Sequence, residues 1–586
     1  MPIIGIDLGT TNSLAAVWKD GKCQLIPNAL GEVLTPSAVS IEENGNILVG
    51  RAARDRLVSH PECTAASFKC FMGTETELML AGKAFTPIEL SAFILRRLKE
   101  DAEAFWGEKI EEAVISVPAY FDDNGRSATK AAGELAGFRV ERIINEPSAA
   151  ALAYHKGKDT DMSFLVFDFG GGTLDVSVVD AFSNVIEIVT VAGDNHLGGD
   201  NFNNAIALYF CEQNGLKLSA LPRETQASLI RQAEHCKIAL TTADPVMMVS
   251  EIEGQQRSVM LTNQKLVEIS APILRRLEKP IARALRDCQD AVGEIDEIVL
   301  VGGSCHMPLV QQYLRHILGK TPLCDFDADT TVAIGAGIAA GIKERCQDLR
   351  DTLLTDICPF TLGINVINRD DASNDLFSPI IERNTTLPAS RLRSYYTARD
   401  NQTKMSIEIY QGEGIYCRDN LKLGSLEIEV PRAARGQEGA DVRFTYDING
   451  ILQVEVTCKS TGQKQQALIL NPNLKMDEKA LKKRIQELEQ YKLLPREEEE
   501  NKVLLARAAR LYEESTGMLR EQIHQQIDFF NLLLHEGVEP KLRRYRKDLN
   551  HFFDQIDAHL SSDDEIIRAF HDDYLDDYED EEDFDL

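Results

Sequence analysis

Two stretches decide the fold of this sequence: Ile4-Gly-Ile-Asp-Leu-Gly-Thr-Thr-Asn12 and Leu165-Val-Phe-Asp-Phe-Gly-Gly-Gly-Thr173. Each combines an apolar run typical of a buried strand, an aspartate near its end and a glycine turn that includes threonine. Glycine lets backbone N–H groups approach phosphate oxygens, and threonine hydroxyls add further donors. Asp7 and Asp168 suit Mg²⁺ held through water, because that ion gives up its water reluctantly. Two such loops facing each other would hold a polyphosphate from both sides.

A third glycine turn follows an apolar run at Ile298-Val-Leu-Val-Gly-Gly-Ser304, where a flat base or ribose could lie against bare backbone. One such run is usually only a turn, but three in one region, two of them with matched acids, favour a nucleotide site. Other common nucleotide and hydrolase motifs are absent: there is no G-x-x-x-x-G-K-[ST], no N-terminal G-x-G-x-x-G, no G-x-S-x-G and no H-E-x-x-H. The sequence therefore predicts a phosphate clamp made of two loops.

The composition limits the class of protein. The chain has 586 residues, too many for one core, and a formal net charge of −30, which argues against nucleic-acid binding. Its apolar stretches fall short of the roughly 20 residues that cross a bilayer. The 12 cysteines include no C-x-x-C pair, and the N-terminus lacks a secretory signal pattern. We therefore expect a cytoplasmic protein without nucleic-acid or membrane partners.

Three regions with different sequence patterns follow one another, and they predict the domains. Residues 1–350 alternate short β-branched runs with helical segments, as α/β domains do. Residues 357–475 contain short alternating strands, with Asn449-Gly450 suited to a two-residue hairpin turn, and indicate an antiparallel sandwich or barrel. Residues 476–561 are rich in Leu, Glu, Lys, Arg and Gln and predict helices. Residues 562–586 are strongly acidic, and we expect them to form a disordered tail.

Nine stretches occur in a fixed order along the chain: IGIDLGTTNS, VPAYFDDNGRSATKAAGELAG, RIINEPSAAALAY, VFDFGGGTLDVSVV, GDNHLGGDNF, LVGGS, TDICPFTLGI, ERNTTLP and YDINGIL. In content and order they resemble the Hsp70 molecular chaperones over nearly the whole chain, and look closest to a specialised bacterial branch of that family. The resemblance implies a two-lobed, actin-like (ribonuclease H-type) α/β ATPase domain, an antiparallel β-sandwich that binds peptides, and an α-helical lid. It also implies an ATP-dependent chaperone that binds and releases exposed hydrophobic segments of unfolded proteins.

Carried over residue by residue, the resemblance assigns a catalytic group of Lys69, Glu146, Thr173 and Asp175. Lys69 would position the attacking water and stabilise charge on the transferring phosphoryl group. Glu146, Thr173 and Asp175 would complete the water network. The implied reaction is hydrolysis of ATP to ADP and phosphate.

The implied ligands are ATP or ADP with Mg²⁺, and K⁺ is a further candidate. Asp7 and Asp168 would hold Mg²⁺, largely through water. His306 stands where many family members have an arginine that stacks on adenine, and neutral histidine would stack more weakly. The full set of implied nucleotide contacts is Asp7, Gly9, Thr10, Thr11, Asn12, Asp168, Gly170, Gly171, Gly172, Gly198, Gly199, Asp200, Glu234, Lys237, Thr241, Gly302, Gly303, Ser304, His306 and Asp329.

A short linker at 351–356 separates the ATPase region from the sandwich. It contains Leu353 and Leu354, two leucines bounded by acids, which need a place to be buried. The resemblance implies that these leucines couple the domains, and that Pro118 and Arg126 relay the nucleotide state.

The resemblance also assigns the binding partners. A J-domain co-chaperone would contact Arg142 and Asn145 and stimulate hydrolysis. The segments 73–87 and 244–261 are short for the family and remove surface that exchange factors grip, so the need for such a factor stays open. The implied peptide cleft is formed by Ile364, Ile367, Tyr395, Ala398, Met405 and Ile407.

Two other interpretations of the phosphate clamp stay open. A kinase of the same architecture could phosphorylate a small molecule such as a sugar, but residues 357–561 would then have no evident task. A passive binder could hold ATP without turnover, although Lys69, Thr173 and Asp175 argue against it.

Overall fold

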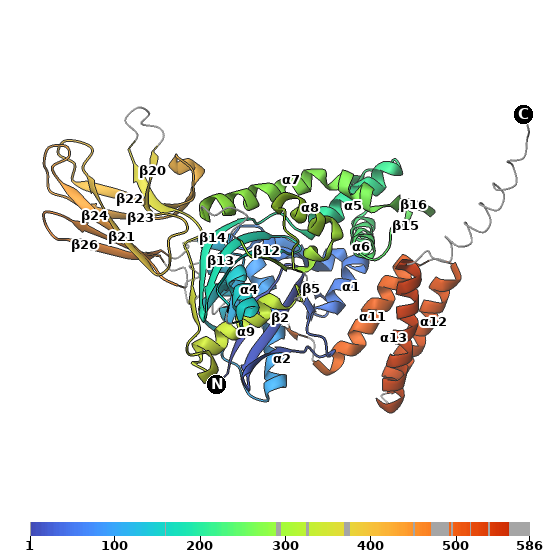
Figure 1. Cartoon of the computed structure of the whole chain (residues 1–586). Helices are drawn as coiled ribbons and strands as arrows, with labels where there is room; N and C mark the ends of the chain where they lie inside the picture. The colour runs from blue at the N-terminus through green and yellow to red at the C-terminus, as the bar shows by residue number, and fades with distance from the viewer. Residues whose placement is uncertain are drawn as a thin grey trace, which may run out of the picture.

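The computed structural model describes residues 2–158, 160–252, 254–288, 295–323, 327–367, 375–448, 452–469, 492–493, 496–515, 517–536 and 539–561. A large α/β body lies in the centre, with a β-rich domain at one end and a helical bundle at the other (Figure 1). The predicted turn at Asn449-Gly450, the start of the helical region at 476–491 and the acidic tail at 562–586 lie outside the described residues.

The first lobe of the central body is built on a mixed sheet. Its strand order is β11 (Arg139–Asn145), β10 (Glu112–Val117), β1 (Ile3–Leu8), β2 (Asn12–Lys19) and β3 (Lys22–Ile26), with β4 (Thr35–Pro36) paired to β2. β1 runs parallel to β10 and antiparallel to β2, so Leu8 faces Ser13 across a tight turn. The helices are α1 (Arg51–Ser59), α2 (Pro87–Trp106) and α3 (Asp123–Leu135).

A smaller sheet extends this lobe. Its order is β27 (Lys492–Leu493), β6 (Asn46–Val49), β5 (Ala38–Ile41) and β7 (Thr64–Ala66), so a strand from the far end of the chain pairs with β6. The short helical turn η2 (Phe68–Phe71) follows β7, and the hairpin β8 (Leu78–Leu80) and β9 (Lys83–Phe85) comes next. α2 then begins with Thr86 and Glu89 forming reciprocal hydrogen bonds with each other's backbone N–H groups, which fixes its N-terminus.

The second lobe repeats the plan of the first. Its sheet has the order β17 (Glu297–Val301), β12 (Met162–Phe169), β13 (Leu174–Phe182), β14 (Val185–Asp194) and β18 (Leu353–Thr355). β12 runs antiparallel to β13 and parallel to β17, as β1 does to β2 and β10. The remaining elements are α4 (Glu146–His155), α5 (Gly199–Gln213), α6 (Arg223–Ala239), β15 (Val246–Ile252), β16 (Gln255–Leu261), α7 (Asn263–Cys288), η5 (Gly303–His306), α8 (Pro308–Leu318) and α9 (Thr331–Lys343).

Two helices, α4 and α9, hold the lobes together between the two sheets. Their buried alanines pack with Val114 of β10 and Val166 of β12 in one apolar cluster. Backbones approach closely here, because a Cβ at Gly335 of α9 would collide with the carbonyl oxygen of Ala149 of α4. The repeated sheets with a shared helical layer confirm the predicted two-lobed, actin-like α/β domain.

The β-rich domain is a sandwich of two antiparallel sheets, as predicted. One sheet has the order β20 (Leu376–Ile381), β19 (Leu362–Val366), β22 (Lys404–Gln411) and β23 (Leu421–Glu429). The other has the order β21 (Ala389–Tyr396), β24 (Gly439–Tyr446), β25 (Leu452–Cys458) and β26 (Lys464–Ile469). Alternate residues such as Val454 and Val456 face a common core.

The described part of the bundle consists of three helices: α11 (Arg496–Glu514), α12 (Gly517–Glu536) and α13 (Glu539–Ser561). They share an apolar core that includes Leu504, Phe530 and Phe553. The bundle does not cover the sandwich in this structure. It packs against α1 on the opposite side of the central body (Figure 1), because α11 buries Val503 and Ala506 there. No described helix is long and apolar enough to cross a membrane.

Candidate functional site

The two glycine turns of the sequence repeat face each other between the lobes. The first lies between β1 and β2, and the second between β12 and β13. A Cβ at Gly171 would collide with Oγ1 of Thr11, and a Cβ at Gly172 would lie 2.5 Å from Sγ of Cys70. Side chains at these positions would therefore push the loops apart, so glycine is required by the close approach.

A cavity of about 560 Å³ opens between the loops and has walls from both lobes. Most of the residues predicted to contact nucleotide line it: Asp7, Gly9, Thr10, Thr11, Asn12, Asp168, Gly170, Gly171, Asp200, Glu234, Lys237, Thr241, Gly302, Gly303, Ser304, His306 and Asp329. The predicted catalytic residues Lys69, Glu146 and Thr173 line it as well.

Four predicted residues lie behind this lining. A Cβ at Gly198 would collide with the backbone of Gly171, and one at Gly199 would lie 2.5 Å from Oγ of Ser304. These glycines therefore shape the phosphate end through close packing. Gly172 and Asp175 are also set back from the cavity wall.

The predicted catalytic residues form one buried charged group. Lys69 lies on η2 and is 3% exposed, and its Nζ donates to Oε1 of Glu146 over 2.6 Å. Asp175 accepts hydrogen bonds from the backbone N–H groups of Ala119 and Tyr120, over 3.0 and 3.3 Å. The carboxylate is therefore fixed in place by the segment that follows β10.

Carboxylates outnumber ammonium groups in this part of the site. Burial, with Glu146 next in effect, raises the pKa of Asp7 to about 6 and that of Asp175 to about 7. Burial and the surrounding acids raise the pKa of Asp168 well above its usual range. Burial alone would lower the pKa of Lys69, but Glu146 and the aspartates outweigh it and raise that pKa.

This excess of negative charge fits the predicted cation. Asp7 and Asp168 lie at the ends of β1 and β12, and no described group of three His, Cys, Asp or Glu side chains is placed to hold an ion directly. Two carboxylates without a third protein ligand are the arrangement expected for an ion that keeps most of its water. Mg²⁺ held by Asp7 and Asp168 stays a prediction that the donor set fits.

The third glycine turn lines the cavity beside the glycine turn that follows β12. Gly302 has φ 84°, and a Cβ there would lie 2.5 Å from the carbonyl oxygen of Phe169. Ser304 Oγ donates to the carbonyl oxygen of Gly170 over 2.8 Å, which connects this turn to the phosphate loop. His306 is half exposed, and its Nε2 lies 3.3 Å from Oδ2 of Asp329.

Sequence reasoning missed Arg54, which lines the same cavity from α1. Its Nη2 lies 2.7 and 2.8 Å from the two carboxylate oxygens of Glu234 on α6. Nothing in the run Arg51-Ala-Ala-Arg-Asp distinguishes it from an exposed helix, because its partner lies 180 residues away.

The sequence model of the Hsp70 protein family matches residues 3–80 and 74–564. The chain belongs to the Hsp70 family. It is 40% identical over 504 residues to the chaperone protein DnaK of Methanothermobacter thermautotrophicus, and that match covers 83% of each chain. It is also 40% identical over 509 residues to the chaperone protein DnaK of Thermotoga neapolitana, again over 83% of each. This Hsp70 chain is accordingly an ATPase and an ATP-dependent chaperone.

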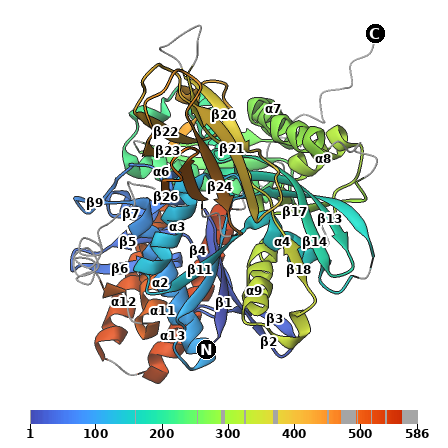
Figure 2. The same cartoon turned by 90° about the vertical axis from the view of Figure 1, so that its left-hand side faces the viewer.

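The linker of this Hsp70 chain extends the sheet of the second lobe. Leu353–Thr355 forms β18, which pairs in parallel with β14 (Figure 2). Leu354 packs on the apolar cluster between the lobes, whereas Leu353 is 57% exposed. Only Leu354 is therefore partly buried, because neighbouring residues of a strand point to opposite faces.

One of the predicted relay residues, Arg126, is connected to the end of the linker through Asn145. Arg126 donates to the carbonyl oxygens of Ala119 and Phe121 and to Oδ1 of Asn145. Nδ2 of Asn145 in turn donates to Oδ2 of Asp356 over 2.8 Å. Asn145 is thus buried within this relay, so its predicted contact with a J-domain protein would require the relay to open.

The remaining predicted residues of these two groups lie nearby. Pro118 is buried at the end of β10, and Arg142 is partly exposed on β11. Burial lowers the pKa of Arg142, and the charge of Asp356 acts against this.

The sandwich of this Hsp70 chain is docked on the ATPase lobes. Asp123 at the start of α3 receives a hydrogen bond from the hydroxyl of Tyr446 over 3.1 Å, and its backbone N–H donates to Oε1 of Gln411 over 3.1 Å. Arg383 donates to both carboxylate oxygens of Asp287 at the end of α7, over 2.8 and 2.9 Å. Both lobes therefore contribute to the contact.

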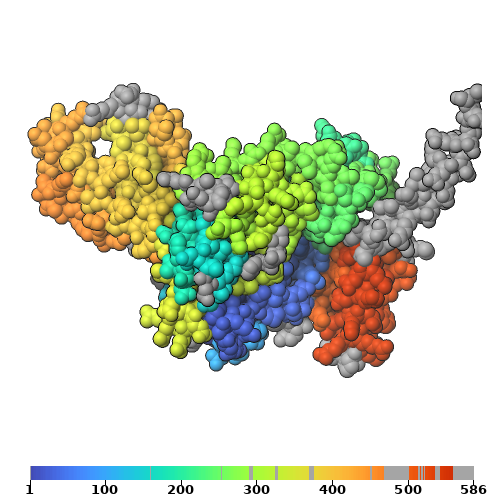
Figure 3. All heavy atoms as spheres, in the orientation of Figure 1, coloured from blue at the N-terminus to red at the C-terminus, as the bar shows by residue number. Residues whose placement is uncertain are grey.

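The predicted peptide-cleft residues divide into two groups. Ile364, Met405 and Ile407 are buried in the sandwich core, and Tyr395 packs against it. Ile367 is 50% exposed, and Ala398 is partly exposed. Figure 3 shows an opening through the sandwich between its yellow and orange surfaces. The role of these residues in peptide binding stays a prediction.

Proposed function

We propose that this Hsp70 chain binds and releases exposed hydrophobic segments of unfolded polypeptides, and that ATP hydrolysis is coupled to closure of the sandwich. The observation that carries the proposal is β18: the linker is a strand of the ATPase sheet while the sandwich is docked. A movement of the second lobe therefore reaches the sandwich through backbone hydrogen bonds. By reciprocity, a peptide that prefers one docking state must change nucleotide affinity by the same factor.

The proposed roles in hydrolysis follow from the buried charged group. Lys69, held by Glu146, would direct a water at the γ-phosphate and stabilise the charge that develops there. The glycine loops would present backbone N–H groups to the β- and γ-phosphates. Mg²⁺, held through water by Asp7 and Asp168, would neutralise charge on the phosphate oxygens.

Three features support assigning the chain to a specialised branch of the family. By the family resemblance, His306 stands where many members have a stacking arginine, and the segments 73–87 and 244–261 are short for the family. We also propose that a J-domain co-chaperone contacts Arg142 and Asn145. The identity of the client proteins and the need for an exchange factor stay open.

The test of the proposed function is steady-state ATP turnover with and without an unfolded peptide. A chaperone should release phosphate slowly and accelerate with peptide. A passive binder would show no turnover. A small-molecule kinase would ignore peptide and accelerate with its acceptor, which would contradict the proposal.

Asp123 leads to a prediction about pH. Burial raises its pKa from 3.8 to about 6 in the docked structure, although Arg126 and Tyr446 act against the rise. The docked state thus binds a proton more tightly than an undocked state with an ordinary pKa. The stabilisation of docking by protonated Asp123 is therefore fully present below about pH 4 and is lost as the pH rises through 6. Docking should therefore weaken between pH 5 and pH 7.5.

Asp123→Asn should strengthen docking at pH 7.5 and flatten its pH dependence, because the amide stays neutral and keeps an oxygen for Tyr446. Docking is measured as resistance of the linker at 351–356 to proteolysis in the presence of ATP. Asp441→Asn on the surface of the sandwich is the control and should keep the wild-type pH profile. A steeper pH dependence in Asp123→Asn would contradict the assignment.

A further inference from the structure

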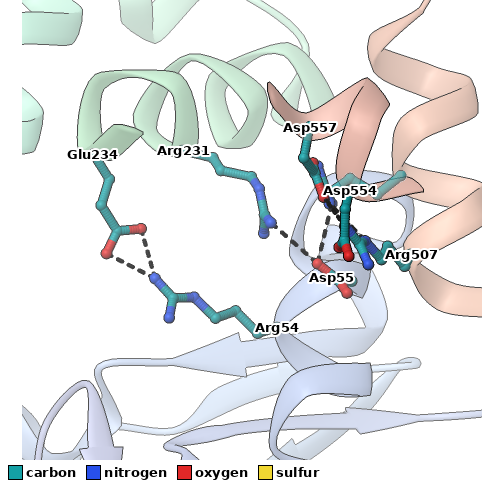
Figure 4. A network of polar contacts seen from close by, with 8 residues as sticks. Arg54, Asp55, Arg231, Glu234, Arg507, Asp554 and Asp557 are labelled. Atoms are coloured by element: carbon teal, nitrogen blue, oxygen red, sulfur yellow. Dashed lines mark hydrogen bonds and ion pairs between the residues drawn. The ribbon is translucent and has the colours of Figure 1, made fainter. Parts of the chain in front are cut away.

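Two ion pairs join the lobes beside the nucleotide cavity. Arg54 and Asp55 lie next to each other on α1 of the first lobe, and Arg231 and Glu234 lie on one face of α6 of the second (Figure 4). Arg54 is 2.7 Å from Glu234, and Arg231 is 3.1 Å from Asp55. Arg54 and Glu234 also line the cavity. The lobes therefore cannot separate on this side without breaking both pairs.

The helical bundle enters the same network through Arg510 of α11. Nε of Arg510 donates to Oδ1 of Asp55 over 3.0 Å, and its Nη2 lies 2.8 Å from Oδ1 of Asp557 on α13. Arg507 pairs with Asp557 as well, over 2.5 Å. Arg510 is 2% exposed and Asp55 is 4% exposed. A buried arginine thus connects the bundle to the first lobe.

Nonpolar contacts place the bundle on both lobes. α11 packs along α1, where Val503 and Ala506 join Ala52 and Ala53 in one apolar cluster. α13 contacts α6 of the second lobe. Because the three helices share their own core, they move as one body. One body therefore contacts the two helices that must part when the cavity opens.

Asp55 is the point at which these contacts meet. It accepts hydrogen bonds from Arg231 on α6 and from Arg510 on α11. Removing one partner from a buried ion pair is strongly unfavourable, because it leaves a buried charge without compensation. Opening of the lobes removes Arg231 from Asp55, and the attached bundle resists that movement through α13. Bundle attachment and lobe opening are therefore opposed, and the coupling acts in both directions.

We propose that the bundle of α11, α12 and α13 is a clamp on the entrance of the nucleotide cavity, and that bound nucleotide leaves rapidly only after the bundle has detached. The inference rests on the proposed nucleotide site. It gives the bundle a second task besides the lid role that the family resemblance implies, namely control of how long a nucleotide stays bound.

The test is release of mant-ATP from the full chain, followed by stopped flow after a chase with unlabelled ATP. Hydrolysis is measured in parallel, so that release of the triphosphate alone is compared. Arg510→Ala should accelerate release by about 5- to 150-fold, the range of typical coupling between sites. Arg54–Glu234 and Asp55–Arg231 are left in place by this change.

The matched control is Arg546→Ala. Arg546 is also a buried arginine of the bundle, and it forms an ion pair with Glu500 and a hydrogen bond with Asn501, which both lie on α11. This variant should release mant-ATP at the wild-type rate. Acceleration equal to that of Arg510→Ala would mean that general loosening of the bundle, and not its contact with Asp55, sets the rate, and would overturn the clamp.

A second variant detaches the bundle by another route. Val503→Asp places a charge in the apolar contact with α1 and should accelerate release to a similar extent. Adding Arg510→Ala to it should have little further effect, because both changes act on the same contact. If both single variants keep wild-type circular dichroism and the wild-type release rate, the clamp is wrong. If the wild-type chain binds no mant-ATP, the proposed nucleotide site itself fails.

Discussion

Lys69→Ala should bind Mg·ATP and fail to hydrolyse it. Lys69 is a buried cation that interacts with Glu146, Asp7 and Asp168, and we propose that its Nζ stabilises the charge that develops on the phosphoryl group. Loss of one such donor typically slows chemistry by about 10²- to 10³-fold. Binding should persist, because the glycine loops and the turn at Gly302 remain. Single-turnover hydrolysis and calorimetric binding of Mg·ATP measure the two steps separately.

Lys99→Ala is the control for this change. Lys99 is a cation on the outside of α2 that donates to the carbonyl oxygen of Gly137 and does not line the cavity. Its removal should leave hydrolysis unchanged. Undiminished single-turnover hydrolysis in Lys69→Ala would reject the catalytic role of Lys69, and loss of binding would assign it to nucleotide affinity instead.

Replacing Leu353 and Leu354 by aspartate should abolish stimulation of the ATPase by peptide. Leu354 packs on the cluster between the lobes, so a carboxylate there would have to be buried or would pull β18 away from β14. Basal hydrolysis should survive, because no linker residue lines the nucleotide cavity. The measurement is steady-state turnover over a range of peptide concentrations.

The exposed half of the linker provides an internal control. Leu353→Asp alone should keep most of the stimulation, since this side chain is largely in solvent, whereas Leu354→Asp alone should remove it. Leu392→Asp, on the exposed face of β21, tests whether a new charge on the sandwich matters in itself. Full stimulation in the double variant would refute coupling through β18.

Local sequence patterns predicted the parts of the fold that depend on neighbouring residues. The strands around Asp7 and Asp168, and the alternating strands of the sandwich, are where periodicity placed them. The similarity of the two glycine turns to each other predicted that they face each other. Whether the turn at Asn449-Gly450 forms stays a prediction, because it lies outside the described residues.

Contacts between distant segments could not be predicted from the sequence. Asp55 and Arg510 are separated by 455 residues, and each looks like an exposed helical charge until the helices are placed together. Asp123 and Tyr446 are also far apart in the sequence, by 323 residues, so no local pattern predicts their hydrogen bond. Three further features are properties of the assembled domains, and no local pattern predicts them. They are the docking of the bundle on α1, the burial of Asn145 and the exposure of Leu353.

The pairing of β27 with β6 has a cost whenever the C-terminal helices leave α1. Lys492 and Leu493 occupy the outer side of β6, so their departure would uncover a row of unpaired backbone N–H and C=O groups. An open strand of this kind recruits any extended chain that can add to it, including the same strand of a second molecule. Detachment would therefore make the protein prone to self-association, and we expect crowded, nucleotide-depleted samples to be the first to aggregate.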